Sequence, residues 1–173
     1  MLLGLGIIVG LPLLVIAVGL LLPETIHRIG TAKVPVEPEV LWTRLMDGEH
    51  FPVSSAMARS VTALPDEDGR PAWTEHIGHS KVTVRTVEAD APRKLVRELS
   101  DSVVPMTARW TFSILPDGEG SIVSIENHTV VAHGTWHVPF FRVMTRVFGA
   151  VRKGMEQYVR SLAGGGDVHF EWS

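Results

Sequence analysis

The sequence contains no cysteine and only one tyrosine among its 173 residues. Without cysteine the chain has no disulfide framework, no thiol nucleophile and no cysteine-ligated zinc or iron–sulfur site. The formal net charge of −3 leaves no excess of basic side chains, which argues against a nucleic-acid-binding surface. The sequence also lacks a phosphate-binding loop, a nucleophile elbow and an HExxH motif. These absences exclude the enzyme classes that such motifs define.

Charge is absent from residues 1–22, which form a long aliphatic run. As a helix this run would be roughly 33 Å long, enough to cross a hydrocarbon core of about 30 Å. A cleaved signal peptide would need a basic start, a shorter apolar run and a small-x-small cleavage site, and all three are missing. A core helix of a small domain would show a polar stripe. We therefore expect a transmembrane anchor over residues 1–23.

Basic side chains flank this run on one side only, because Arg28 and Lys33 follow it and none precedes it. The positive-inside rule then predicts a single-pass membrane protein whose domain is cytoplasmic. Gly6 and Gly10 have the GxxxG spacing that lets two membrane helices pack closely. Glycine is also frequent in such helices by chance, so a homodimer through these glycines stays an open alternative.

Residues 24–173 carry all 16 basic and 19 acidic side chains and have the size of one ordinary domain. Alternation predicts a first strand over residues 29–36, and Pro38 with flanking acids starts a helix over residues 37–46. A second short helix or an irregular turn is expected over residues 50–57. Alternating runs separated by turn residues then predict six antiparallel strands, over residues 58–64, 70–78, 80–89, 94–100, 107–115 and 120–131.

After Pro139 the apolar residues recur at helical spacing, which predicts one helix of about 24 residues that ends at Gly164. In a domain of short antiparallel strands, one face of such a helix must be covered by the sheet. Residues 164–173 begin with three glycines and are expected to form a flexible tail.

The order strand, helix, short helix, six strands, long helix is distinctive. It is accompanied by four sequence features, VPVEPEVLW at residues 34–42, GRPAWTE at 69–75, APRKLV at 91–96 and RWTF at 109–112. In this order and these features the chain resembles the START/Bet v1-like (SRPBCC) superfamily, which includes polyketide cyclase/dehydrase-like and lipid-transfer proteins. The resemblance covers about residues 29–162, within an expected ligand-binding domain of residues 27–163. It implies an α+β helix-grip fold (β-α-α-β6-α), with an antiparallel sheet wrapped around the long C-terminal helix and a cavity for a hydrophobic ligand between them.

Strand parity and helical spacing predict which side chains line that cavity. The predicted ligand-binding residues are Trp73, Glu75, Ile77, Trp110, Phe112, Val123, Ile125, Asn127, Met144, Phe148 and Val151. Glu75 and Asn127 are polar groups on apolar faces, and burying such a group without a partner costs roughly 1–3 kcal/mol. In one interpretation they orient a bound molecule. In the other they lie near strand ends in contact with solvent, or pair with Arg97.

Histidine spacing gives no metal site. His76 and His79 would turn to opposite faces of a strand, and His133 and His137 lie in a segment that Gly134 and Pro139 mark as a loop. We therefore expect neither a metal nor another cofactor.

Three functions stay open. The first is membrane-anchored binding or transport of a hydrophobic small molecule, lipid-like or polyketide-like, in the cavity. The second is a cyclase/dehydratase-type enzyme, for which Glu75 with Asp101 or His76 is the best available acid–base pair. No spacing specifies that pair, so the sequence favours binding over catalysis. The third is an interaction module, which a collapsed cavity below about 300 Å³ would favour.

Overall fold

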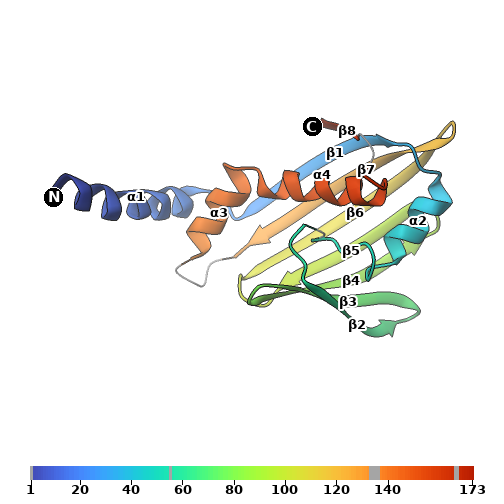
Figure 1. Ribbon diagram of the computed structural model, residues 1–173, viewed down its shortest axis with the longest axis horizontal. Coiled ribbons are helices and arrows are strands. Elements are labelled where there is room, and N and C mark those ends of the chain that lie inside the picture. The colour runs from blue at the N-terminus through green and yellow to red at the C-terminus, as the bar shows by residue number, and fades with distance from the viewer. Residues whose placement is uncertain (1, 55, 133–136, 166–167) are drawn as a thin grey trace.

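The computed structural model describes residues 2–54, 56–132, 137–165 and 168–173, and within the first helix it describes the side chains of residue 10 and of residues 12 onward. In chain order the elements are α1 (Leu2–Leu21), β1 (Thr25–Val34), α2 (Pro38–Met46), β2 (Ser60–Glu67), β3 (Arg70–Ile77), β4 (Ser80–Asp90), β5 (Lys94–Asp101), β6 (Met106–Asp117), β7 (Gly120–Val131), α3 (Val138–Arg146), α4 (Ala150–Leu162) and β8 (His169–Trp172). In this described part, the strands form one antiparallel sheet in the order β2-β3-β4-β5-β6-β7-β1-β8. Helix α4 lies along one face of that sheet, while α1 projects away from it (Figure 1).

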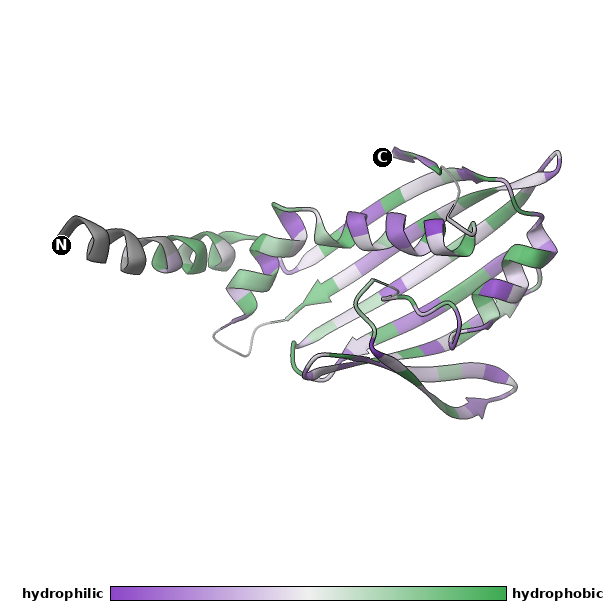
Figure 2. Cartoon of the chain, viewed as in Figure 1, coloured by the Kyte–Doolittle hydropathy of each residue, from purple (hydrophilic) through white to green (hydrophobic). Residues whose placement is uncertain are grey.

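The arrangement is that of the helix-grip fold, so the predicted α+β class is confirmed. All six strands predicted after residue 57 are present as β2 to β7, each within a few residues of its predicted bounds. Apolar and polar residues alternate along several of these strands (Figure 2). On β6 the predicted inward residues Trp110 and Phe112 are buried together with Ala108 and Ile114, because every second side chain of a strand points to the same face.

The core lies between the inner face of the sheet and the helices. Met155, Tyr158, Val159 and Leu162 form the buried face of α4, and they share one apolar cluster with Leu41 and Leu45 of α2. Each of these side chains is almost fully buried. Ala108 and Trp110 of β6 belong to the same cluster and also line the cavity described below, so one wall of that cavity is part of the packed core.

The predicted long C-terminal helix is two helices. The break falls at Gly149, whose φ of +65° lies in the left-handed region that favours glycine. Phe148 lies in the break and is 57 % exposed instead of facing the cavity, and Met144 of α3 is only half-buried. The apolar repeat continues through the break, which is why the sequence predicted one helix.

Residues 47–59 follow irregular turns in their described part, and no second helix occurs there. The reason is a competing acceptor. The backbone N–H groups of Val53 and Ser54 donate to the carboxylate of Glu75, on β3, instead of to helical carbonyl oxygens. The open alternative of an irregular turn is therefore the correct one.

The predicted flexible tail is also wrong for residues 169–172. They form β8, which pairs with β1 and places Phe170 opposite Ala32 and Trp172 opposite Gly30. A Cβ on Gly30 would lie 2.8 Å from the Trp172 ring, so the absence of a side chain at residue 30 is what admits the indole. Trp172 also donates its indole N–H to Glu156 on α4 at 3.0 Å.

The carboxyl end of α1 contacts α3 closely, because Gly19 packs against the backbone of Pro139. The buried Arg142 of α3 donates to Glu24 at 3.1 Å and to the carbonyl oxygen of Val131 at 3.0 Å, which fixes the start of β1 beside α3. Within the residues that the structure describes, no helix is long and apolar enough to cross a membrane. The side chain position of Gly6 lies outside the described residues, and Gly10 has open space around it.

Candidate ligand-binding site

A cavity of about 180 Å³ lies between the inner face of the sheet, the α3–α4 region and the loop of residues 53–57, of which the structure describes all but residue 55. The sheet contributes Trp110, Asn127 and Thr129 to its lining, and α4 contributes Val151 and Gly154. Met57 and Gln157 also line it and are exposed, so the cavity opens to the surface between the loop and α4. Its wall is mostly apolar, which suits a hydrophobic guest.

Trp110 and Asn127 are directly opposite each other on β6 and β7. Both are buried, at 7 % and 0 % exposure, and both line the cavity. The Oδ1 atom of Asn127 accepts a hydrogen bond from Thr129 Oγ1 at 2.9 Å, which leaves Nδ2 as the free end of the amide. Within the described residues neither Asn127 Nδ2 nor Trp110 Nε1 has a hydrogen-bond partner. Two neighbouring residues of the cavity wall therefore each carry a buried donor without a partner.

Glu75 is fully buried, and both oxygens of its carboxylate already accept hydrogen bonds. Its Oε1 accepts from Val53 N at 2.6 Å and from Trp73 Nε1 at 2.8 Å, and its Oε2 accepts from Ser54 N at 2.8 Å. Hydrogen bonds to a charged acceptor are the strong ones. Glu75 thus holds the loop that forms one side of the cavity, and it is a positioning residue for that loop.

Arg97 is the other fully buried charge on the inner face. Its guanidinium lies 4.6 Å from the centre of the Trp73 ring, and it donates from Nη1 to the Tyr158 hydroxyl at 2.6 Å and from Nη2 to the Leu45 carbonyl oxygen. Burial raises the pKa of Tyr158, and the adjacent Arg97 charge partly opposes that rise. No ion pair joins Arg97 to Glu75 among the described contacts, since the Trp73 indole lies between them.

The proposed acid–base partners are not assembled. Glu75 is opposite Val82 and Val82 is opposite Asp101, so the two carboxylates lie two strands apart. Asp101 accepts from Ser80 Oγ at 2.7 Å and from the backbone of the β5–β6 turn, and His76 contacts Thr62 at 3.2 Å. None of the three is among the described residues that line the cavity.

Metal ligation finds no support in the described residues, where no group of three or more histidine, aspartate or glutamate side chains is close enough to hold an ion. His133, one half of the spaced pair considered from sequence, lies outside the described residues. His137 packs edge-on against the ring of Phe141.

Three of the predicted lining residues, Trp110, Asn127 and Val151, do line the cavity. Phe112, Val123 and Ile125 are buried in the core next to it, Trp73 packs between Arg97 and Gly48, and Ile77 is half-buried at the edge of the core cluster. Sequence reasoning missed the loop of residues 53–57 and Gly154. A glycine in the middle of a helix pattern was the available signal, because a missing side chain there leaves space.

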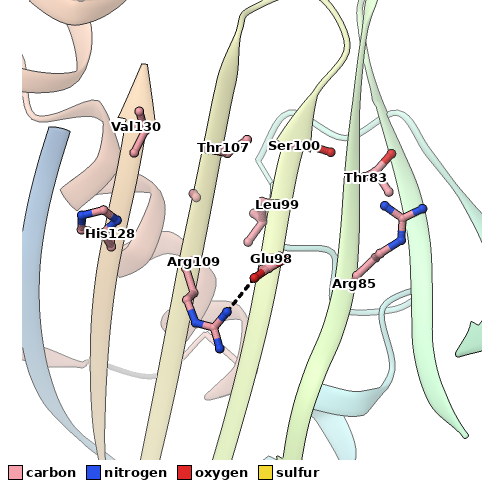
Figure 3. A pocket seen from close by; sticks show the side chains of 10 residues that line it. Thr83, Arg85, Glu98, Leu99, Ser100, Thr107, Arg109, His128 and Val130 are labelled. Atoms are coloured by element: carbon pink, nitrogen blue, oxygen red, sulfur yellow. Dashed lines mark hydrogen bonds and ion pairs between the residues drawn. The ribbon is translucent and has the colours of Figure 1, made fainter. Parts of the chain in front are cut away.

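A second hollow, of about 400 Å³, lies on the outer face of the sheet over β4 to β7. Figure 3 shows Arg109 reaching Glu98 across neighbouring strands, at 2.6 Å. Arg85 pairs with Glu67 at 3.1 Å, and the ring of His128 lies near that of His27. The side chains of Arg85, Glu98 and Arg109 on this surface all have ion-pair partners, unlike the unpaired donors of Trp110 and Asn127.

No protein family model matches the sequence, and no curated protein is significantly similar to it. Solved structures do match. A START superfamily protein from Mycobacterium smegmatis has a TM-score of 0.60 at 15 % identity, over 80 % of this chain and 97 % of that one. The di-domain aromatase/cyclase StfQ of the steffimycin biosynthetic pathway has a TM-score of 0.59 at 11 % identity, over 82 % of this chain and 52 % of that one. The aromatase/cyclase Zhui from Streptomyces sp. R1128 has a TM-score of 0.53 at 15 % identity, over 83 % and 99 %. At these identities the likeness concerns the fold, which is the one that START-like and aromatase/cyclase proteins share.

Proposed function

We propose that this protein binds a small hydrophobic molecule that carries a hydrogen-bond acceptor, such as a carbonyl or hydroxyl oxygen, in the cavity between the sheet and α4. The observation that carries the proposal is the pair of buried donors, Trp110 Nε1 and Asn127 Nδ2, in a mostly apolar wall. Leaving a buried donor unpaired costs about 1–3 kcal/mol. A ligand oxygen placed between the two would recover that free energy, while the rest of the molecule fills the apolar space.

The cavity volume limits the size of the guest. Pockets for drug-sized ligands have volumes of about 300–1,000 Å³, whereas an apolar cavity of about 150 Å³ holds a molecule the size of benzene. The 180 Å³ found here fits a small ring or a short chain. A lipid or a polyketide-like molecule would require the loop of residues 53–57 or the Tyr158 side chain to move outward.

The same volume favours a second candidate function, an interaction module in which the cavity is vestigial and the surface docks a partner. Cyclase or dehydratase chemistry has less support. The names of two structural neighbours suggest it, but the carboxylates of Glu75 and Asp101 are engaged in hydrogen bonds that hold the loop and the β5–β6 turn.

We also propose that α1 holds the domain at a membrane. Residues 1–22 carry no charge, and Leu13, Leu14, Leu20 and Leu21 are each more than half exposed. Phe148, just after α3, and Phe140 of α3 add to the exposed apolar surface at the same end of the molecule. Soluble monomers rarely expose apolar patches larger than a few hundred Å². A cytoplasmic orientation and pairing of two copies through Gly6 and Gly10 remain predictions from the sequence.

Flotation tests the membrane proposal. The full-length chain, mixed with phosphatidylcholine vesicles, is expected to rise with them through a density gradient, and a double variant with glutamate at both Leu13 and Leu14 is expected to remain at the bottom. A wild-type chain that remains at the bottom would contradict the proposal.

Calorimetric titration of the full-length protein with nonan-2-one tests ligand binding. We expect saturable binding to one site, with a loss of at least about tenfold in affinity when Gly154→Phe fills the cavity. A Cβ on Gly154 meets no atom within 4 Å, so a larger side chain has room to enter the cavity. Lys153→Phe, on the exposed face of the same helix, is the matched control. An absence of binding to the wild-type protein would favour the interaction module.

A further inference from the structure

Four buried side-chain atoms in the described part of the chain lack a hydrogen-bond partner: Thr86 Oγ1, Arg97 Nε, Trp110 Nε1 and Asn127 Nδ2. They belong to four successive strands, β4 to β7. In the strand register Thr86 is opposite Arg97, Arg97 is opposite Trp110, and Trp110 is opposite Asn127. All four residues are at most 7 % exposed. The unpaired atoms therefore form a single row across the inner face of the sheet.

The chemistry of this row is uniform. An indole N–H, a guanidinium Nε–H and an amide N–H₂ can only donate, and the threonine hydroxyl can donate as well as accept. Neighbouring strands are about 4.8 Å apart, so the row offers one donor at roughly that interval. Its complement is an elongated molecule with acceptor oxygens at a similar spacing, lying across the strands.

The charges around the row favour a neutral molecule. Arg97 and Glu75 are both fully buried, and both contact Trp73. The guanidinium carbon of Arg97 lies 4.6 Å from the centre of the Trp73 ring, and the indole N–H donates a hydrogen bond to the Glu75 carboxylate. One buried positive charge is thus balanced by one buried negative charge. A ligand carboxylate would add a second negative charge to the interior, which is costly.

Tyr158 of α4 contacts two members of the row, Arg97 and Trp110. The cavity is lined by Trp110 and Asn127 but not by Arg97 or Thr86, and the Tyr158 hydroxyl accepts a hydrogen bond from Arg97 Nη1 at 2.6 Å. The rings of Trp110 and Tyr158 are 6.1 Å apart. If the Tyr158 ring moved away from the sheet, the existing cavity would extend along the row to Arg97 and Thr86.

We propose that this row is an extended binding site for a neutral ligand with two or more acceptor oxygens about one strand spacing apart. Asn127 and Trp110 bind one acceptor at the open end, and Arg97 and Thr86 bind another behind Tyr158. Because the proposal refines the cavity function, it rests on the proposed function. It assigns Thr86 and Arg97, which sequence reasoning did not include in the site, as residues that determine specificity.

Three matched probes test the proposal by calorimetric titration of the full-length protein in detergent. Each probe is also titrated into detergent solution without protein as a blank. They are nonane-2,6-dione, whose two carbonyl oxygens are about one strand spacing apart in an extended chain, then nonan-2-one and nonanoate. We expect the dione to bind about three- to tenfold more tightly than the monoketone, the effect of one or two added neutral hydrogen bonds. Nonanoate at pH 7 should bind more weakly than either ketone.

Thr86→Val is the specific variant, because it keeps the side-chain shape and removes only the unpaired hydroxyl. It should reduce the advantage of the dione over the monoketone and leave monoketone affinity as it is. Thr107→Val, the same substitution on the outer face of β6, should change neither. Because Thr86 Oγ1 has no partner, the variant is expected to fold.

The outcomes separate the two proposals. Equal affinity for dione and monoketone, or a dione advantage that survives Thr86→Val, would overturn the row while leaving the cavity function intact. Tightest binding of nonanoate would also overturn it, since it would make Arg97 a site for acids. If neither ketone binds, both the row and the proposed function fail.

Discussion

The carboxylate of Glu75 accepts a hydrogen bond from the backbone nitrogen of Val53 at 2.6 Å, across 22 residues of sequence. A side chain in the middle of β3 therefore sets the path of the loop that closes one side of the cavity. The Glu75 carboxylate also accepts hydrogen bonds from Ser54 N and Trp73 Nε1, so three donors depend on it.

Glu75→Gln should destabilise the domain by about 3 kcal/mol, because hydrogen bonds to a buried charged acceptor contribute about 1.5–3 kcal/mol and Arg97 would lose its balancing charge. Urea unfolding followed by tryptophan fluorescence measures the change. Glu98→Gln is the control, since Glu98 forms an exposed ion pair with Arg109 and such pairs contribute about 0–1 kcal/mol. Equal effects of the two substitutions would show that Glu75 does not hold the loop.

Two glycines of the C-terminal helices should respond to alanine with opposite signs. Gly154 lies inside α4 with open space where the methyl group of an alanine would lie, so Gly154→Ala should stabilise the protein by about 0.5–1 kcal/mol. Gly149 has a φ of +65°, and Gly149→Ala should destabilise it by about 1–2 kcal/mol. Thermal unfolding of both variants measures this contrast, and stabilisation by Gly149→Ala would mean that α3 and α4 join into one helix.

Much of the sheet and part of the site could be predicted from sequence because strand parity is a local property. Trp110 and Asn127 were placed on the inner face by alternation alone, and both line the cavity. The loop of residues 53–57 could not be placed this way, since its position depends on the distant Glu75 carboxylate. The row from Thr86 to Asn127 was equally hidden, because it depends on the register between strands and not on any one strand.

Two other differences have causes that the apolar pattern does not reveal. The apolar repeat runs on past Gly149, so periodicity alone joined α3 to α4, and only the left-handed backbone of Gly149 separates them. Residues 169–172 were expected to be flexible because glycines precede them. Their pairing depends on the edge of β1 that β7 does not occupy.

The turn after α2 should be sensitive to pH. A hydrogen bond from His50 Nδ1 to the Asp47 carboxylate, at 2.8 Å, raises the pKa of His50 above its usual 6.5. The folded state therefore favours protonated His50, so this contribution to stability is present below pH 6.5 and is lost as the pH rises through the elevated pKa. An NMR titration of the His50 ring should give a midpoint above 6.5 that returns toward 6.5 in Asp47→Asn. A midpoint at or below 6.5 in the wild-type protein would contradict the pairing.

The contact between Gly30 and Trp172 predicts how the end of the chain is attached. Gly30→Val would place a side chain where the indole packs, since even a Cβ would lie 2.8 Å from the ring, and it should release β8 from β1. We expect a loss of about 1–3 kcal/mol in the free energy of unfolding, a typical cost of overpacking, together with a red shift of Trp172 fluorescence. In the Trp172→Ala background Gly30→Val should cost much less, because the two residues are in contact and their effects are not additive. Strictly additive effects, or fast amide exchange of residues 169–172 in the wild-type protein, would show that the end of the chain does not belong to the sheet.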